Sequence, residues 1–312
     1  MDNTQNSHLE RFDAYMERCL YSNGGFYNSA EQTTGSRGSF ITSPEVGSLF
    51  GAVVANWIRD EAAKTTIKTV YDVGSNRGTL VAELRSQLPD LEVLGVDYQN
   101  GDLTPDEFET QDLSNAIVFA NELLDNLPFR YCRKAGTEIE EAFVSNSELV
   151  WQRAELETDV ANKFETIDDG LTFPVHGSSQ QWISSVLSRN PLSLLMIDYG
   201  MATTAELAKR GDWLRTYQGH IVDVDPLASP GQIDITTDIG FDQLPTPMRT
   251  TAQAEFLVEN GIDALVEEGM LAWEAQKAAP DLASLRMKSR KSQSKALMDP
   301  RGLGSWIVAE WS

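Results

Sequence analysis

The sequence has only two cysteines, Cys19 and Cys132, and no long apolar run. Two isolated cysteines cannot form a disulfide framework and lack the spacing of metal ligands, so we expect small buried residues and no metal site. No apolar segment approaches the roughly 20 residues that cross a bilayer. The stretch MDNTQNSHLERFDAYMERC is polar and acidic, unlike a signal or transit peptide. We therefore expect a soluble, cytoplasmic protein that is not inserted in a membrane.

Basic residues are also scarce, with 25 Lys and Arg against 47 Asp and Glu, which gives a formal net charge of −22. So many acidic groups repel a phosphate backbone, which argues against nucleic-acid binding. A solvated acidic surface is the simplest explanation, and attraction of a cationic substrate is the alternative. A basic cluster within residues 286–295 opposes this trend, and we interpret it as a solvated helix end and loop.

Several catalytic motifs are absent from the chain. There is no G-x-x-x-x-G-K turn of a phosphate-binding loop, no H-E-x-x-H or paired C-x-x-C of a zinc site, and no G-x-S-x-G nucleophile elbow. These absences argue against the enzyme classes that depend on those motifs.

Strand and helix patterns alternate through the middle of the chain. The segments TIKTVYDVG, LEVLGVD, AIVFANEL and LSLLMIDYG are candidate buried strands, and TLVAELRSQL is a candidate helix. This order predicts a parallel, doubly wound, Rossmann-like α/β sheet. We also expect a short strand that ends near Asp112. When this strand is counted, LSLLMIDYG is the fifth strand, and a polar insertion at about 134–180 precedes it. We expect N-terminal helices and a lid loop in residues 1–66 and the sheet in residues 67–312.

The turn YDVGSNRGTL follows the first of these strands. A glycine turn there aims helix amides at a ligand, and Asp97, about 20 residues later, can accept both ribose hydroxyls. Asn76 replaces the glycine that lets a dinucleotide pyrophosphate approach the backbone, which disfavours NAD. S-adenosylmethionine has no pyrophosphate, and asparagine tolerates the left-handed conformation. The turn predicts this cofactor, although a simple tight connection would give a similar pattern.

Other residues at strand ends are candidates for the same cofactor. Asp72 is an acid in a buried strand, and a cationic cofactor would supply its partner. Asp112 either accepts from the adenine amino group or is a simple loop acid. The complete predicted cofactor set is Asp72, Gly74, Asn76, Gly78, Asp97, Asp112 and Asn121.

Longer phrases resemble a known family. GSFITSPEVGSLFGAVVANW, YDVGSNRGTLVAELR, ANELLDNLPFR, LLMIDYG, LRTYQGHIVDVDPLASPGQIDITTDIGFDQL and LMDPRGLGSWIV resemble, in this order, the MidA-type methyltransferases over roughly residues 24–310. The resemblance implies a class I methyltransferase fold that uses S-adenosyl-L-methionine. That family includes a mitochondrial factor that dimethylates an arginine of a respiratory complex I subunit, so it implies a protein substrate carrying arginine. The family turn usually reads G-P-G-R-G, from which Ser75 and Asn76 depart.

An arginine acceptor requires carboxylates that hold and orient its guanidinium. Glu122 and Asp125 in NELLD are the candidate catalytic residues, because one helical turn would point both carboxylates into the same cleft. The alternative is that Asp125 caps a helix and Glu122 pairs structurally.

Further residues are candidates for substrate binding. The phrase with Thr42, Pro44 and Glu45 follows a glycine- and serine-rich loop that we interpret as a lid, although a helix start capped by Ser43 explains it equally well. For Asp198 and Tyr199 the alternative is a plain strand end, and for His220 it is a structural histidine. Arg215 would shape a substrate wall with Trp213 and Tyr217, for which core packing is the alternative. The complete predicted set is Thr42, Pro44, Glu45, Asp198, Tyr199, Arg215 and His220.

The sequence therefore predicts an S-adenosylmethionine-dependent methyltransferase that modifies arginine in a protein. A respiratory complex subunit is implied as substrate by the resemblance alone. A small-molecule methyltransferase on the same fold and a non-catalytic assembly protein remain open, because the fold and cofactor do not choose the acceptor.

Overall fold

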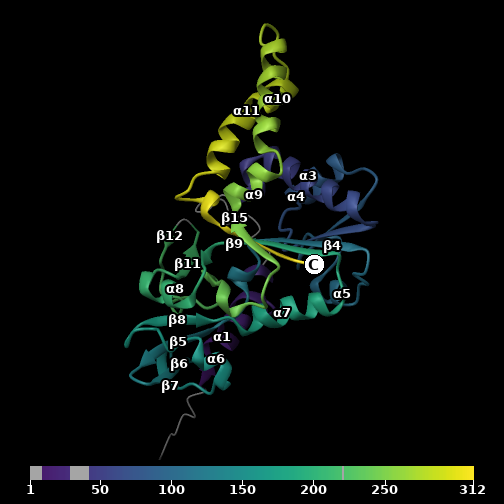
Figure 1. Ribbon diagram of the computed structural model, residues 1–312. Coiled ribbons are helices and arrows are strands. Elements are labelled where there is room, and N and C mark those ends of the chain that lie inside the picture. Colours follow the sequence, from purple (N-terminus) through teal and green to yellow (C-terminus); the bar gives the residue numbers. More distant parts are fainter. Residues whose placement is uncertain (1–8, 29–41, 220) are drawn as a thin grey trace, which may run out of the picture. The chain divides into compact units, whose positions relative to one another are not determined.

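The computed structural model describes residues 9–28, 42–219 and 221–312 (Figure 1). The chain forms two compact units whose segments alternate along the sequence. Unit 1 comprises residues 1–40, 124–184 and 200–246, and unit 2 comprises residues 41–123, 185–199 and 247–312. The expected division at residue 66 does not coincide with these units, because the helices just before it pack in the same core as the strands just after it.

Unit 2 is built on a six-stranded sheet in the order β15-β16-β9-β4-β2-β3. The strands are β2 (Thr69–Val73), β3 (Glu92–Val96), β4 (Ala116–Asn121), β9 (Ser193–Asp198), β15 (Arg249–Ala252) and β16 (Ile307–Trp311). Strands β3, β2, β4 and β9 are parallel neighbours, and β16 is antiparallel to both β9 and β15. Strands β4 and β9 are buried at every residue, as expected when helices cover both faces of a parallel sheet. The predicted Rossmann-like α/β class is confirmed.

One predicted strand is wrong. In the described chain no strand ends at Asp112, and helix α5 (Pro105–Glu109) occupies the segment before it. The side chain of Thr104 accepts from the backbone N–H of Glu107 and the Glu107 side chain bonds back, so a capping box starts this helix. Strand β9 is therefore the fourth parallel strand rather than the fifth.

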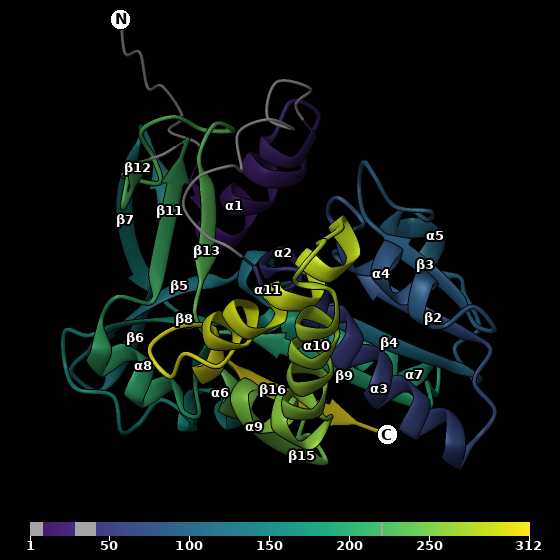
Figure 2. The ribbon, with the colours of Figure 1, turned by 90° about the horizontal axis from the view of Figure 1, so that it is seen from above.

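Apolar residues at helical spacing pack the unit 2 helices on the sheet. These helices are α2 (Ser43–Val46), α3 (Ser48–Lys64), α4 (Thr79–Gln87), α9 (Gln253–Glu259), α10 (Ile262–Gln276) and α11 (Leu282–Leu297). Leu49, Phe50 and Val53 of α3 are fully buried and belong to the same core as Ile117 and Phe119 of β4. Figure 2 shows α3 lying beside β4 and β9 of this sheet. Among the described helices, none has the length and hydropathy needed to cross a bilayer.

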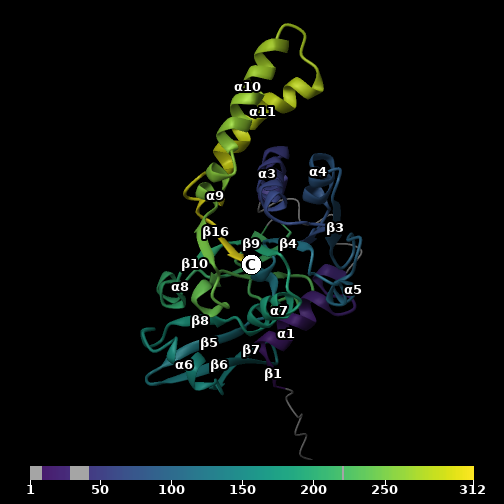
Figure 3. The same ribbon diagram turned by 45° about the vertical axis from the view of Figure 1, so that its right-hand side comes forward.

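Helices α10 and α11 form an antiparallel hairpin that extends away from the unit 2 sheet (Figure 3). A Cβ at Gly269 would lie 2.6 Å from the Met287 carbonyl oxygen, so a glycine is needed for this close helix contact. Arg290 donates to the Leu265 carbonyl and pairs with Glu268 at 2.7 Å. The basic cluster of the sequence lies on α11, which is helical throughout.

The described part of unit 1 contains three smaller sheets. One joins β1 (Glu10–Arg11), β6 (Glu138–Ser145), β5 (Arg130–Ala135) and β8 (Thr172–Val175), with β7 (Glu148–Arg153) paired to β6. The others join β12 (Ile221–Val222), β11 (Leu214–Gln218) and β13 (Asp234–Thr237), and β10 (Gly200–Met201) with β14 (Ile239–Gly240). The unit also contains α1 (Phe12–Tyr21), η1 (Phe26–Asn28), η3 (Leu124–Asn126), α6 (Thr158–Asn162), α8 (Thr204–Arg210) and η4 (Phe241–Gln243). The chain passes between the units within α7 (Gly177–Ser188).

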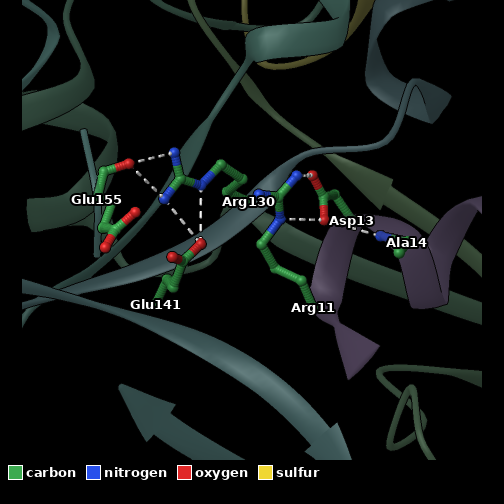
Figure 4. Close-up of polar contacts among 6 residues, drawn as sticks. All are labelled: Arg11, Asp13, Ala14, Arg130, Glu141 and Glu155. Carbon is green, nitrogen blue, oxygen red and sulfur yellow. Dashed lines mark hydrogen bonds and ion pairs between the residues drawn. The ribbon is translucent and has the colours of Figure 1, made fainter. Parts of the chain in front are cut away.

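Two ion pairs lie beside the apolar core of unit 1, of which Arg130–Glu141 is largely buried and Arg11–Asp13 is exposed. Arg130 pairs with the buried Glu141 at 2.8 Å and also donates to the Glu155 carbonyl, and Arg11 pairs with Asp13 at the start of α1 (Figure 4). Removing one partner of such a buried pair leaves an uncompensated charge, so the pair fixes the strands that carry it. Cys19 and Cys132 are unbridged and buried, as the sequence predicts.

Candidate functional site

The carboxyl ends of three parallel strands meet at one edge of the unit 2 sheet. Val73 lies opposite Val96 of β3 on one side and Ala120 of β4 on the other. The residues that follow these strands are therefore neighbours, and ligands of such sheets bind at this edge. The structure brings together here the predicted cofactor residues Asp72, Gly74, Asn76, Gly78, Asp97 and Asn121.

The glycine turn after β2 is built from left-handed residues. Gly74, Asn76 and Gly78 have φ of 77°, 48° and 71°. The backbone N–H groups of Gly74 and Ser75 both donate to the Val96 carbonyl, at 2.9 and 3.2 Å. Asn76 thus occupies the left-handed conformation that asparagine tolerates better than most residues, so the turn closes without a middle glycine.

Asp97 ties the turn to the end of β3. Its Oδ2 accepts from the backbone N–H of Asn76 at 2.9 Å, and its Oδ1 accepts from the backbone N–H of Gln99 at 3.1 Å. An ionised carboxylate has about four acceptor sites, so two remain for other donors. Asp97 is only half-buried. It can therefore shape the turn and accept ribose hydroxyls at the same time.

Asp72 is an acid inside the sheet that has no counter-ion among the described residues. Its side chain is 4% exposed, and among the described residues no hydrogen-bond donor contacts it. Burial, and then the negative charge of Asp97, raise the pKa of Asp72 to about 7. A cationic ligand would lower this pKa by stabilising the carboxylate.

Asn121 offers a second unsatisfied group at the same edge. Its Nδ2 donates to Glu122 Oε1 at 2.8 Å. Its Oδ1 is buried and has no hydrogen-bond partner among the described residues. Buried polar atoms almost always have partners, so this oxygen fits a donor from a bound polar molecule. Together with Asp72 and Asp97, it gives the edge the acceptor set that a cationic nucleoside cofactor requires.

The assignment of Asp112 to an adenine pocket is wrong. Asp112 precedes β4, and the N–H of Lys68, just before β2, donates to the Asn115 carbonyl beside it. These contacts lie at the amino ends of the parallel strands, whereas the cofactor candidates lie at the carboxyl ends. The exposed Asp112 carboxylate accepts from the Ser114 N–H at 3.0 Å, as a local turn acid.

Thr42, Pro44 and Glu45 lie at helix α2, beside the glycine turn. Glu45 is 4.0 Å from Arg77 of that turn. The predicted Ser43 cap is wrong, because Thr42 precedes the helix and the buried Ser43 hydroxyl instead donates to Gln253 at 3.0 Å. Residues 29–41 of the predicted lid loop lie outside the described residues.

The predicted helical turn that would carry Glu122 and Asp125 together does not form. Glu122 follows β4 with a left-handed φ of 54°, and its N–H donates to the Ile197 carbonyl at 2.9 Å. A residue in this conformation cannot be part of a right-handed helix. The short helix η3 begins only at Leu124, and Asp125 is buried within it, in unit 1.

The remaining predicted substrate residues have different surroundings. Asp198 ends β9 at the carboxyl edge, fully buried, and accepts from the Tyr199 N–H. Tyr199 packs in the unit 2 core, with its ring 5.6 Å from that of Trp306. Arg215 lies on β11 of unit 1 and pairs with Asp238 at 2.9 Å. His220 lies outside the described residues.

Sequence reasoning missed one residue at the carboxyl edge. Tyr98 directly follows Asp97 and is 48% exposed, although large aromatic side chains are usually buried. An exposed ring beside the ribose candidate is suited to contact a nucleoside base. The signal was present in the sequence, as an aromatic residue directly after the acid that ends the second strand.

Comparisons with known proteins indicate the family of this chain. Residues 96–259 match the model of a family described as "Putative S-adenosyl-L-methionine-dependent methyltransferase". The chain is 24% identical to the mitochondrial protein arginine methyltransferase NDUFAF7 homologue of Caenorhabditis elegans, over 80% of this chain and 72% of that protein. It is 23% identical to mouse protein arginine methyltransferase NDUFAF7, also mitochondrial, over 80% of this chain and 70% of that protein.

A solved structure shares the fold. A protein from Burkholderia thailandensis, crystallised bound to S-adenosyl-homocysteine, superposes with a TM-score of 0.78 at 23% identity. The superposition covers 97% of this chain and 88% of that chain.

We predict that Asp97→Ala weakens the binding of S-adenosylmethionine by about 1.5–3 kcal/mol, because hydrogen bonds to a charged acceptor are lost. This corresponds to a roughly 10- to 150-fold increase in the dissociation constant, measured by titration calorimetry. Asp112→Ala is the matched control, since Asp112 also accepts a local N–H but lies at the opposite edge. Equal affinities of the two variants would contradict the ribose assignment.

We predict that Asn76→Gly keeps wild-type cofactor affinity, because glycine adopts a φ of 48° without strain. Asn76→Val should lose about 1–2 kcal/mol of stability or binding, since a β-branched side chain is strained in this conformation. Thermal unfolding and equilibrium binding measure both effects. A marked loss of affinity in Asn76→Gly would instead mean that the amide side chain contacts the ligand.

The raised pKa of Asp72 predicts a pH dependence. Binding of a cation requires the carboxylate, so cofactor affinity should fall by up to about tenfold per pH unit below a pKa of about 7. The free energy of unfolding of the ligand-free protein should have the opposite pH dependence. The unfolded chain loses the Asp72 proton at a lower pH than the folded protein does, so the contribution of Asp72 to the free energy of unfolding falls as pH rises from about 4 to about 7.

Asp72→Asn should flatten both pH profiles. Calorimetry at pH 6 in two buffers of different ionisation enthalpy should detect proton release on cofactor binding to the wild-type protein only. The same proton release in Asp72→Asn would assign it to another group.

Proposed function

Because the chain belongs to a family of S-adenosyl-L-methionine-dependent methyltransferases, we propose that it methylates arginine in a protein substrate. Its cofactor is S-adenosyl-L-methionine, and the acceptor groups at the carboxyl edge of unit 2 fit that molecule. The names of the worm and mouse relatives support an arginine acceptor. A guanidinium is a cation, which also agrees with the net charge of −22.

The conformation of Glu122 is the observation that carries this proposal. A non-glycine residue with a φ of 54° is strained, and such strain is concentrated at functional sites. The half-buried Glu122 is fixed by its N–H bond to Ile197 and by the side chain of Asn121. A preorganised carboxylate next to the candidate cofactor residues supports the proposal.

We propose the following roles in methyl transfer. When bound, the cofactor supplies an activated methyl group on its sulfonium. Glu122 accepts hydrogen bonds from the guanidinium, orients one nitrogen and stabilises the positive charge while the proton leaves. Asn121 holds Glu122 through its Nδ2 group at 2.8 Å. Asp125, predicted as a second carboxylate, lies in unit 1, and its catalytic role stays a prediction.

The location of the protein is a separate proposal. We propose a cytoplasmic location, whereas the named relatives are mitochondrial. Fractionation of the source cells, followed by immunodetection of the protein, distinguishes these compartments.

We predict that Glu122→Gln reduces methyl transfer to protein by a hundredfold or more, because a charge that stabilises the transition state is lost. Cofactor affinity should change less than about threefold, since glutamine still accepts from Asn121. Glu109→Gln on the exposed end of α5 is the control and should be fully active. The assay uses radiolabelled S-adenosylmethionine with a lysate of the source organism depleted of this protein.

The labelled product decides between the alternatives. Label on arginine that is lost with Glu122→Gln supports the proposal. Label confined to small molecules would indicate a small-molecule methyltransferase. Absence of cofactor binding at millimolar concentration would leave a non-catalytic assembly role.

A further inference from the structure

One face of the β11–β13 ribbon in unit 1 is polar, although the opposite face packs in the apolar core. Arg215 lies opposite Thr236 and Tyr217 lies opposite Asp234. Directly opposed residues of antiparallel strands share a face, so these four side chains project to the same side. The intervening Ile235 is 1% exposed and belongs to the unit 1 core.

Two groups from other segments contact this polar face. The Tyr27 hydroxyl donates to Asp234 Oδ1 at 3.0 Å, and Asn126 Nδ2 donates to the same oxygen at 3.2 Å. Neither bond uses the second carboxylate oxygen of Asp234. The ring of Tyr27 stacks on that of Tyr21, with centroids 5.7 Å apart. The face therefore combines a carboxylate with stacked aromatic rings.

Asp234 has no basic partner among the described residues. Arg210 and Arg215 of the same unit both pair with Asp238 instead, and Arg215 also hydrogen-bonds Tyr217. Burial raises the pKa of Asp234 to about 6, so the group is mainly ionised at neutral pH while surrounded by neutral donors. Asp125 is close enough to Tyr27 and Tyr217 to contribute to the raised pKa of each. The face thus holds the carboxylates of Asp234 and Asp125, while the charge of Arg215 beside Tyr217 is paired with Asp238, so a cation is favoured at Asp234.

Thr236 provides an independent indication of a ligand. It is 4% exposed, and its hydroxyl has no hydrogen-bond partner within the described part of the chain. Its position two residues after Asp234 on the same strand face places the two side chains about 6.5 Å apart. A buried hydroxyl without a partner is costly, and a donor bound between Thr236 and Asp234 would satisfy it.

We propose that this guanidinium site, formed by Asp234, Thr236, Tyr217, Tyr27 and Asn126, binds an arginine side chain of the protein substrate. The planar guanidinium carries five N–H donors in a fork that can reach two acceptors about 6.5 Å apart, and it stacks on aromatic rings. A lysine ammonium is a compact point charge and uses these features less well. The identity of the partner as a protein carrying arginine rests on the proposed function.

The test measures binding without catalysis, in the full-length protein saturated with S-adenosyl-homocysteine. The probes are the N-acetyl methylamides of arginine, of lysine and of citrulline, which is a neutral analogue of arginine. Calorimetry should detect arginine binding and at least tenfold weaker binding of lysine and citrulline. Lysine or citrulline binding as tight as arginine would overturn the proposal.

Variants locate the binding. Asp234→Asn should weaken arginine binding at least tenfold while still accepting from Tyr27 and Asn126, and the nearly isosteric Thr236→Val should weaken it at least threefold. Asp212→Asn is the control, because its exposed carboxylate lies in the same unit and pairs with Arg210. Unchanged arginine affinity in Asp234→Asn and Thr236→Val would overturn the site. If Asp234→Asn fails to fold in thermal unfolding, Thr236→Val alone decides.

Methylation assays separate this inference from the proposed function. If the wild-type protein labels arginine and Asp234→Asn has an unchanged KM for the protein substrate, the guanidinium site is overturned and the proposed function stands. Asp234-dependent arginine binding without any arginine label would overturn the function and support the site.

Discussion

The hydrogen bond from the Asn76 N–H to Asp97 is the constraint on which the candidate cofactor site depends. It joins the turn after β2 to the end of β3, so the left-handed turn and the ribose acceptor are fixed by the same contact. The same turn leads directly into α4, whose apolar side packs on the sheet. The geometry of the site is thus set by the backbone of the fold, and side chains such as Asp72 add the charge.

The sheet and its carboxyl edge could be predicted from the sequence because the signals are local and strong. Parallel strands buried on both faces appear as continuous apolar runs, and a polar or glycine residue marks the point where each one ends. The neighbouring positions of Asp72, Asp97 and Asn121 follow from that pattern, since parallel strands end at a common edge.

Other features depend on tertiary contacts that a local pattern does not contain. The N-cap at Ser43 fails because Gln253, more than 200 residues away, bonds the hydroxyl that would have capped the helix. The helix before Asp112 is an exception, because its capping box at Thr104 is a local signal that the strand prediction did not use. The left-handed Glu122 is likewise fixed by a backbone bond to Ile197 of a different strand. The polar face of unit 1 combines Tyr27, Asn126 and Asp234. Each of these residues comes from a different one of the three chain segments that form unit 1.

The position of β16, second from one edge of the sheet, has a consequence for the order of folding. This strand lies between β9 and β15, yet it follows both of them in the chain. Until residues 307–311 leave the ribosome, β9 has one unpaired edge, and its apolar side chains, including Leu195 and Ile197, lack their neighbours. An exposed apolar strand edge is a site of aggregation. The nascent chain therefore exposes an aggregation-prone strand edge up to the moment when β16 pairs with β9.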